Sequence, residues 1–367
     1  MGIHHLKNYL LFILLGILAL MVLACEPLNT TMVPPTPEEP VEEEGIVEDT
    51  TTFLGADPVQ LTTSSADDFD PAWEPRDWAI AFMKSKVGQG SPYDIGGVAP
   101  DGPSKRVMAF GPAQDIGIAG ELSWVGTSGW LATNERIVFH EYMIFNTAFS
   151  PFNRDTKYDG DEAFTRVLKI PGGMGGDGFS VSRDGSRAMW KNRTSHNPDN
   201  SVISLRSAEF GALAGQSSAG FGDLLVTHSA AEDGPLFDQG FAMGPWGFSF
   251  AISQKTGSGF DIYTRSATDG EMESRLTDTC DGGAMNINPD ISPDFKWVAF
   301  SSAPDADSHS DIYIVSDDGA DLFQITNTPN ISERWPTWSP DGLSLAYAAT
   351  VHSAAAPNWD IYMISSE

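Results

Sequence analysis

Few residues in this sequence have the types and spacing that catalysis requires. A serine nucleophile of the α/β-hydrolase kind stands in a Gly-x-Ser-x-Gly turn, and that pattern is absent from all 367 residues. The seven histidines do not show the spacing of zinc ligands. The glycine-rich run 172–178 lacks the lysine that a phosphate-binding loop uses. The chemistry-bearing residues therefore favour binding over catalysis.

Two acidic stretches have the oxygen donors that a hard cation such as calcium needs. In residues 305–311 the donors fall at alternate positions and include the carboxylates of Asp305, Asp307 and Asp311. The stretch lacks the glycine and the distal glutamate of an EF-hand loop. A second acidic group lies in residues 155–162. A solvated hairpin tip is the simpler interpretation of both, with calcium as the alternative and no other cofactor expected.

The pair Arg334-Trp335 is the main candidate for a binding surface. Arginine and tryptophan are the residue types that dominate binding hot spots. The pair stands directly before Pro336, where we expect the innermost strand of a repeat unit to begin and the preceding loop to turn into the mouth of a central channel. Asp70 and Asn288 stand before a proline at the same position of their own units. These four residues form the predicted ligand surface, with strand capping as an equally simple explanation.

A sequence repeat places these candidates. Two units with a period of 47 to 49 residues stand out near the C-terminus, at 276–313 and 325–362. Each contains a Leu-Thr or Ile-Thr pair, a Ser-Pro-Asp turn and an Asp-Ile-Tyr run. Weaker copies can be followed back to residue 57, which gives about six units. A period of this length indicates a repeat architecture.

The repeat units are built from strands. Short runs rich in β-branched and aromatic residues lie between clusters of Gly, Pro, Asp and Asn, and helical periodicity is absent after the leader. The run Ser-Pro-Asp-Gly at 339–342 suits a type I turn between antiparallel strands. Four strands per unit around one axis would leave only short edges exposed. We therefore predict an all-β protein, a six-bladed β-propeller with four-stranded blades, in residues 57–367.

The two ends of the repeat region complete each other. The last unit stops after its third strand, at 360–364, and lacks the Leu-Thr ending. A run with that ending stands at the front, from Val59 to Thr62. We predict that residues 59–62 pair with residues 361–364, so that an N-terminal strand closes the last blade and the ring. Val59 and Leu61 should then be buried.

The order Trp-Ser-Pro-Asp-Gly at 338–342, then Asp-Ile-Tyr, and Leu-Thr at the unit end resembles the WD-like repeat of the TolB-type propellers. The resemblance extends over residues 57–367, and it is specific in the last two units and weak between 100 and 245. It implies a propeller fold and the role of a binding module. The N-terminal α/β domain of TolB has no counterpart here, so a role in the Tol system is not implied. The hydrolase domain that accompanies related repeats in prolyl oligopeptidases has no counterpart either.

The first 24 residues resemble the signal peptide of a bacterial lipoprotein. Lys7 precedes an apolar run, and Val22-Leu23-Ala24-Cys25 resembles a lipobox, in which the cysteine becomes lipidated. An uncleaved anchor helix or an ordinary signal with a chance cysteine are the alternatives. Residues 25–56, acidic and rich in proline, are predicted to be a disordered tether. With Cys25 acylated, Cys280 has no partner for a disulfide.

The net charge of −29 bears on the partner. It repels nucleic acid and anionic membrane surfaces. We therefore expect an envelope protein or a small neutral or cationic ligand as partner, a monomeric protein, and contact with the membrane through the lipid anchor only. The resemblance to bacterial lipoproteins implies that Glu26 after the cysteine does not signal retention in the inner membrane, so we expect the outer membrane, facing the periplasm.

Together these observations predict an exported, lipid-anchored binding or scaffold protein of the bacterial cell envelope that does not catalyse a reaction. The alternative is a glycan-active propeller enzyme, a lyase or a hydrolase, with carboxylates at the channel mouth as acid and base. Two converging carboxylates, one with a raised pKa, would favour the enzyme. A mouth lined by arginine and aromatic side chains would favour the binding protein.

Overall fold

The computed structural model describes residues 53, 56–63, 65–74, 79–84, 94–100, 108–109, 119–124, 130–137, 141–148, 164–170, 175–193, 202–209, 222–229, 240–279, 282–352 and 358–366. Contacts within the chain divide it after Asp49, and all of these residues belong to the unit Thr50–Glu367. Cys25, Cys280 and residues 155–162 lie outside the described residues. Among the described residues, no helix is long and apolar enough to cross a membrane.

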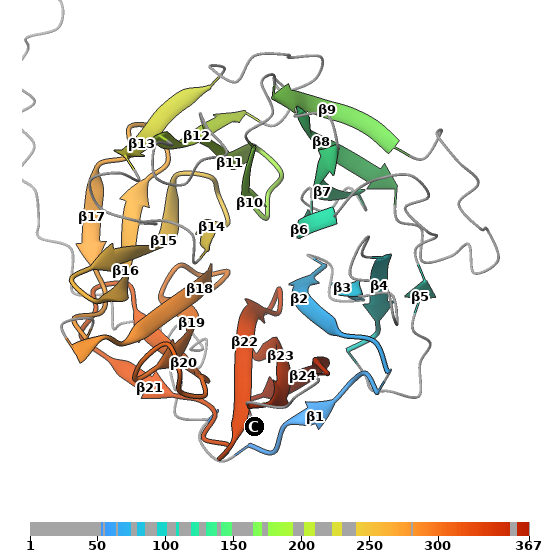
Figure 1. The fold of residues 1–367 in the computed structure, drawn as a ribbon, viewed down its shortest axis with the longest axis vertical. Helices are drawn as coiled ribbons and strands as arrows, with labels where there is room; N and C mark the ends of the chain where they lie inside the picture. The colour runs from blue at the N-terminus through green and yellow to red at the C-terminus, as the bar shows by residue number, and fades with distance from the viewer. Residues whose placement is uncertain are drawn as a thin grey trace, which may run out of the picture. The chain divides into compact units, whose positions relative to one another are not determined.

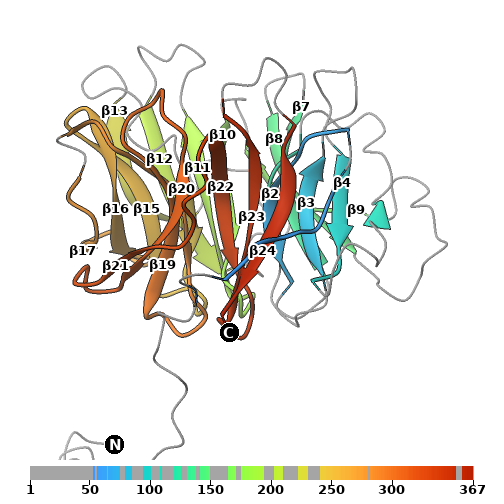
Figure 2. The same cartoon turned by 90° about the horizontal axis from the view of Figure 1, so that it is seen from below.

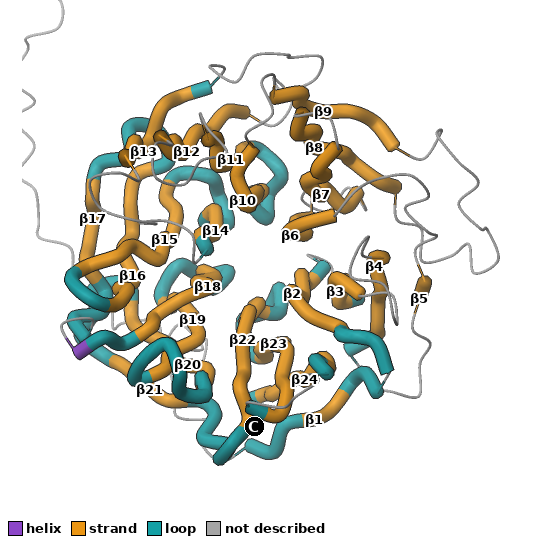
Figure 3. Tube along the Cα trace, viewed as in Figure 1, coloured by secondary structure: helices purple, strands orange, loops and turns teal. Residues whose placement is uncertain are grey.

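The described residues form β-strands joined by turns and loops (Figure 3). Three sheets have four antiparallel strands each, in chain order. The first contains β2 (Asp68–Trp73), β3 (Ile80–Lys84), β4 (Asp94–Val98) and β5 (Met108–Ala109). The second contains β6 (Ala119–Trp124), β7 (Trp130–Ile137), β8 (Glu141–Ala148) and β9 (Phe164–Ile170). The third contains β10 (Gly175–Val181), β11 (Arg187–Arg193), β12 (Val202–Glu209) and β13 (Asp223–Ser229).

A longer sheet combines two sets of four strands. One set contains β14 (Phe241–Met243), β15 (Ser249–Thr256), β16 (Gly259–Ser266) and β17 (Met272–Arg275). The other contains β18 (Met285–Ile291), β19 (Trp297–Ala303), β20 (Asp311–Ser316) and β21 (Leu322–Gln324). A single parallel pairing of Phe260 with Met285 joins the two sets. The fifth sheet contains β22 (Ile331–Trp338), β23 (Ser344–Val351), β24 (Asp360–Ser365) and β1 (Val59–Gln60).

The strands that begin each set are the inner strands: β2, β6, β10, β14, β18 and β22. Each of them contacts the inner strand of the following set, and β22 contacts β2. Figure 1 shows these strands around a common centre, with the later strands of each set farther out. In the side view of Figure 2 the strands run along the direction of that centre line. The inner strands therefore present the surface on which the candidate residues lie.

The predicted pairing of the two ends is present in the structure. Strand β1 is antiparallel to β24, with Val59 opposite Met363 and Gln60 opposite Tyr362. Leu61 is buried as expected. Val59, in contrast, is 44% exposed, so the prediction of its burial is wrong. It belongs to the outermost strand of its sheet, which has a neighbour on one side only.

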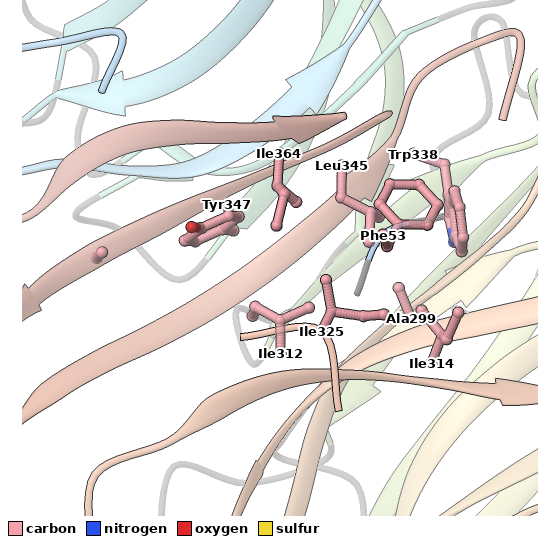
Figure 4. Packing of buried hydrophobic residues seen from close by; sticks show 10 residues of the cluster. Phe53, Ala299, Ile312, Ile314, Ile325, Trp338, Leu345, Tyr347 and Ile364 are labelled. Atoms are coloured by element: carbon pink, nitrogen blue, oxygen red, sulfur yellow. The ribbon is translucent and has the colours of Figure 1, made fainter. Parts of the chain in front are cut away.

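The packed part of the chain reaches back to residue 53, into the stretch predicted as a tether. Phe53 is 3% exposed, and its ring lies edge-on to that of Trp338 with centroids 6.0 Å apart. Figure 4 shows Phe53 among the buried side chains of the last two sets of strands, beside Leu345 and Ala299. Ala56 packs against the same cluster.

The Ser-Pro-Asp-Gly turn after β22 forms as its sequence predicts. The Gly342 N–H donates to the Ser339 carbonyl at 3.0 Å, which is the bond expected between the first and fourth residues of a β-turn. The Ser339 hydroxyl donates to the Asp341 carboxylate at 2.6 Å. Gly342 has a φ of 75°, a conformation that glycine adopts without strain. The turns at Ser182 and Ser292 have the same bond from serine to aspartate.

Candidate functional site

The residues of the predicted ligand surface occupy one equivalent place in three inner strands. Asp70 of β2, Asn288 of β18 and Trp335 of β22 each precede a proline, and each lies at a break in the strand register. Such a break is a β-bulge, which bends a strand and re-aims its side chains. All three residues have a positive φ, of 52°, 54° and 55° respectively. We call these three places the inner-strand bulges.

The three inner-strand bulges share a backbone conformation, but its energetic cost differs among them. Asn and Asp tolerate the left-handed region because their short polar side chains bond locally. A bulky residue there is an outlier, and strain of this kind costs on the order of 1 to 3 kcal/mol. It persists only where the surroundings impose it, and it is found most often at functional sites. Trp335 is therefore the strained member of the three.

Aromatic packing holds Trp335 in this conformation. Its ring centroid lies 5.0 Å from that of Trp359 and 5.7 Å from that of Phe69. Phe69 directly precedes Asp70, so this contact connects the bulge of β22 with the bulge of β2. The Trp335 side chain remains partly exposed. A ring that is fixed by two neighbours and still reached by solvent can contact a partner with little loss of conformational entropy.

Arg334 is the positively charged member of the surface. Within the part of the chain that the structure describes, Arg334 forms no ion pair, and its buried Nε has no hydrogen-bond partner. Burial lowers the pKa of Arg334. That no described carboxylate pairs with Arg334 is unexpected in a chain that has 50 acidic residues and 21 basic ones. An acceptor group on a partner would satisfy a donor whose desolvation is otherwise unfavourable.

Asn288 contributes a second buried polar group to the inner surface. Its Oδ1 has no hydrogen-bond partner among the described residues. Gly240, which precedes β14, lies close to it: a Cβ added at Gly240 would lie 3.1 Å from the Asn288 Cα. Asp70, in β2, is partly exposed. The four predicted residues thus lie on the neighbouring inner strands β2, β22 and β18.

Sequence reasoning missed an arginine that spans the inner strands. Arg183, in the turn after β10, donates to the Trp338 carbonyl at 2.8 Å and pairs with Asp290 of β18 at 3.5 Å. Burial lowers the pKa of Arg183 and raises that of Asp290, because desolvation outweighs their attraction. The sequence did contain a sign of this role, because Arg183 occupies the position at which the turns that begin at Ser292 and Ser339 have proline. An internal ion pair therefore occupies the inner surface near Trp338, whereas Arg334, earlier in β22, has no such partner.

A polar junction repeats at the third strand of the last three sets, β16, β20 and β24. At β16 the Ile262 N–H donates to the Thr277 hydroxyl at 2.9 Å, and that hydroxyl donates to Asp261 at 2.9 Å. Arg275 donates to the same carboxylate at 2.5 Å. At β24 the equivalent bonds join Ile361, Thr62 and Asp360. The Asp-Ile-Tyr and Leu-Thr motifs of the sequence are therefore the two halves of one structural contact.

The junction at β20 departs from this pattern. The Ile312 N–H donates to Thr326 at 2.8 Å as expected, but the Thr326 hydroxyl donates to Glu333 of β22 instead of Asp311. Glu333 is 2% exposed and Asp311 is 8% exposed. Burial raises the pKa of Glu333 to about 7 and also raises the pKa of Asp311. The structure thus contains a carboxyl pair with raised pKa values, enclosed between strands.

The three carboxylates proposed for calcium do not come together as ligands. Asp305 accepts the Asp307 N–H at 3.0 Å and so shapes its own turn. Asp311 accepts the Gln324 amide at 3.0 Å and the Thr328 N–H at 3.3 Å. Among the residues that the structure describes, no group of three or more His, Cys, Asp or Glu side chains could hold a metal ion. The second acidic group, at 155–162, lies outside those residues.

No known protein family and no curated protein matches the sequence. Solved structures do resemble the fold. A TolB from Agrobacterium tumefaciens is 17% identical with a TM-score of 0.52, over 71% of this chain and 80% of that one. TolB from Acinetobacter baumannii is 16% identical with a TM-score of 0.52, over 79% of this chain and 64% of that one. An oligogalacturonate lyase in complex with manganese is 9% identical with a TM-score of 0.50, over 85% and 94%.

The chain has an all-β fold that matches β-propeller structures. The resemblance to the TolB-type propeller that the repeat motifs implied is present in three dimensions. Identities of 9% to 17% extend this similarity to the fold and no further. The candidate site therefore has to be judged from its own side chains.

Proposed function

We propose that this protein is a lipid-anchored binding protein of the bacterial cell envelope. Its strands form a closed six-bladed ring in which β1 completes the last blade. The lipidated Cys25 and the acidic segment after it hold the ring away from the membrane. The ring binds an envelope protein or a small ligand at the inner-strand bulges and does not catalyse a reaction. The inner-strand contacts, the pairing of β1 with β24 and the similarity to TolB structures support this proposal.

The combination of Arg334 and Trp335 on one strained bulge is the observation that carries the proposal. Arg334 is a cation without a carboxylate partner, and Trp335 is an aromatic ring held in place by Phe69 and Trp359. The partner presents a hydrogen-bond acceptor to the guanidinium and an apolar face to the indole. A neutral acceptor, such as a peptide carbonyl or a sugar hydroxyl, fits a chain whose net charge of −29 repels anions.

A glycan-active enzyme is the second candidate function, and the raised pKa of Glu333 favours it. The burial of Glu333 and Asp311 argues against an enzyme, because these two side chains are only 2% and 8% exposed, respectively. Both carboxyls are also engaged, by Thr326 and by Gln324 respectively. A sugar would have to open this junction before it reached either carboxyl. The binding function is therefore the better supported of the two.

The test replaces Arg334→Gln and Trp335→Asn together in the full-length, lipidated protein. Asn is the residue at the equivalent bulge of β18, so the backbone conformation remains accessible. Partners captured from detergent-solubilised envelopes are quantified by mass spectrometry. The double variant should capture them at least about a hundredfold more weakly, while its melting temperature stays within a few degrees. The control Lys296→Gln removes an exposed cation from another turn and should capture normally. If the wild type and the double variant capture partners equally, Arg334 and Trp335 are not part of the binding surface.

The anchor is tested separately by Cys25→Ser. This variant should leave the membrane fraction or accumulate as an unprocessed precursor, since the several acyl chains of a lipoprotein anchor firmly. Intact-mass measurement of the wild-type protein reports the acyl groups directly. A wild-type protein that is soluble without detergent and has no acyl mass refutes the anchor and leaves the binding surface unaffected.

A further inference from the structure

Among the described residues, no arginine or lysine pairs with the carboxyl groups of the junction between β20 and β22, whereas the two equivalent junctions each contain one. At β16, Arg275 pairs with Asp261 at 2.5 Å, and the following inner strand supplies the amide of Asn286 at 3.4 Å. At β24 the following inner strand supplies Asp68, whose carboxylate pairs with Lys84 at 2.9 Å. Arg275 therefore offsets the charge of Asp261 at β16. At β24, Lys84 pairs with Asp68 and also acts on the second buried carboxyl, Asp360.

Glu333 occupies the same place in β22 as Asn286 in β18 and Asp68 in β2, two residues before the inner-strand bulge. The position of Arg275 is taken here by Gln324, which is neutral and bonds to Asp311 at 3.0 Å. The described groups that act on Glu333 are Asp311 and the hydroxyls of Thr326 and Thr328, and Tyr347 and Tyr362 face it from β23 and β24. His309 acts on Asp311. None of the groups that act on Glu333 is a cation.

We propose that Glu333 holds a proton that keeps this junction closed, and that loss of the proton loosens β22, the strand that bears Arg334 and Trp335. A neutral carboxyl can accept the Thr326 hydroxyl and sit beside Asp311 without a second buried charge. An ionised Glu333 would place a second carboxylate beside Asp311 in an enclosed junction where, among the described residues, no cation acts on Glu333. This is unfavourable through both desolvation and repulsion. Strain at the adjacent bulge leaves little stability to absorb this change.

The direction of the pH dependence follows from the raised pKa of Glu333, about 7 in the folded protein. An unfolded chain releases this proton near pH 4.5. Below that pH the carboxyl is protonated in both states, so stability does not change with pH through this group. Between about 4.5 and 7 the unfolded state loses the proton first, so stability falls as pH rises, and the loss is complete above the folded pKa. Because β22 bears Arg334 and Trp335, loosening of this strand should also weaken partner binding at high pH. That expectation rests on the proposed function, whereas the proposed protonation of Glu333 does not.

The test compares the wild-type protein with Glu333→Gln, which mimics the protonated side chain, between pH 5 and pH 8. Relative to Glu333→Gln, the unfolding equilibrium of the wild type should shift toward the unfolded state by about two orders of magnitude across this range. Hydrogen exchange in peptides that cover β22 should rise with pH in the wild type relative to the variant at the same pH. Parallel pH profiles of the two proteins overturn the proposal.

A second variant keeps the test decisive if Glu333→Gln does not fold. Burial is the main cause of the raised pKa of Glu333, and the charge of Asp311 adds to it. Asp311→Asn retains the titrating Glu333 but removes this added contribution. The midpoint of the stability profile should therefore move to lower pH, and an unchanged midpoint overturns the proposal. No ligand is needed for either measurement. If the variant of Arg334 and Trp335 still binds its partner, the proposed function is refuted, but the proposal for Glu333 is unaffected. If the pH profiles refute the proposal for Glu333, the proposed function is unaffected.

Discussion

The polar junctions and the inner-strand bulges repeat in different ways. A junction keeps residue types and contacts together, since Thr62 and Thr277 each accept an isoleucine N–H and each donate to an aspartate. A bulge keeps its backbone, but its side chain changes from Asp70 to Asn288 to Trp335. A repeated contact indicates a packing requirement. A repeated backbone with a changing side chain leaves that side chain available for a partner.

Strand β22 departs from both patterns. It has Glu333 where its equivalents have Asn286 and Asp68, and it has a strained tryptophan where they have residues that tolerate the left-handed region. The two departures are two residues apart. Local choices that disagree with the repeat are expected at functional positions. The comparison therefore points to β22 as the specialised strand.

The largest expected effect comes from breaking a junction by removing the segment that completes it. A chain of residues 65–367 lacks Thr62, and it also lacks the buried side chains of Phe53 and Leu61. Loss of two large buried apolar side chains alone should lower the free energy of unfolding by roughly 5 kcal/mol or more. Urea denaturation measures this change.

A chain of residues 57–367 is the matched control for that truncation. It retains β1 and the junction and loses the Phe53 ring together with Ala56, which packs against the same cluster, so its free energy of unfolding should fall by about 3 kcal/mol. Equal stability of the two truncated proteins would show that the junction at β24 contributes nothing. The proposal of a closed ring would then lose its main support.

The next effect tests whether the junction at β16 is structural. Asp261 is fully buried and bonds to Arg275 and Thr277. Asp261→Ala removes the buried acceptor of Thr277 and Asn286, while Arg275 keeps its pair with Asp278 at 2.6 Å. The free energy of unfolding should fall by about 3 kcal/mol because several buried donors lose their partner. Asp294→Ala, in an exposed turn, removes a comparable bond from a serine and should have a much smaller effect. Similar losses in a denaturation series would contradict the structural role of the junction.

Local motifs allowed much of the scaffold to be predicted from the sequence. The turn at Ser339 and the pairing of β1 with β24 follow from residues that repeat along the chain and need no knowledge of tertiary contacts. Phe53 was missed because a lone aromatic residue in an acidic stretch does not show a periodic pattern. Arg183 was visible as a departure from proline, but the distance that it spans is set by the arrangement of the sheets.

The sequence shows that the pre-proline residues of the candidate site are equivalent, but it does not show their backbone conformation. The pre-proline positions were singled out correctly as equivalent, but a residue before proline usually adopts the β region. Their left-handed conformation arises from bulges that the neighbouring strands impose. The junction of Glu333 with Thr326 joins β22 to the end of the preceding set, and the register of that contact depends on how the sheets pack. Sequence motifs mark such positions without giving their geometry.

The smallest expected effect on stability tests the other side of the comparison, the bulge of β22. Trp335→Asn removes ring contacts with Phe69 and Trp359, which are worth about 0.5 to 1.5 kcal/mol each. The same change relieves left-handed strain of about 1 to 3 kcal/mol. The two terms oppose each other, so the free energy of unfolding should change by about 1 kcal/mol or less. Denaturation measures the stability, and partner capture should still be lost.

The reverse substitution provides the control. Asn288→Trp introduces the same ring at the bulge of β18, where a Cβ added at Gly240 would lie 3.1 Å from the Asn288 Cα and the space beside the backbone is small. Strain is then added without compensating packing, so stability should fall by about 1 to 3 kcal/mol. If Trp335→Asn instead costs more than about 3 kcal/mol, the Trp335 ring is as structural as Asp261. The bulge would then belong with the junctions, because the side chain that changes along the repeat would be fixed by packing and not free for a partner.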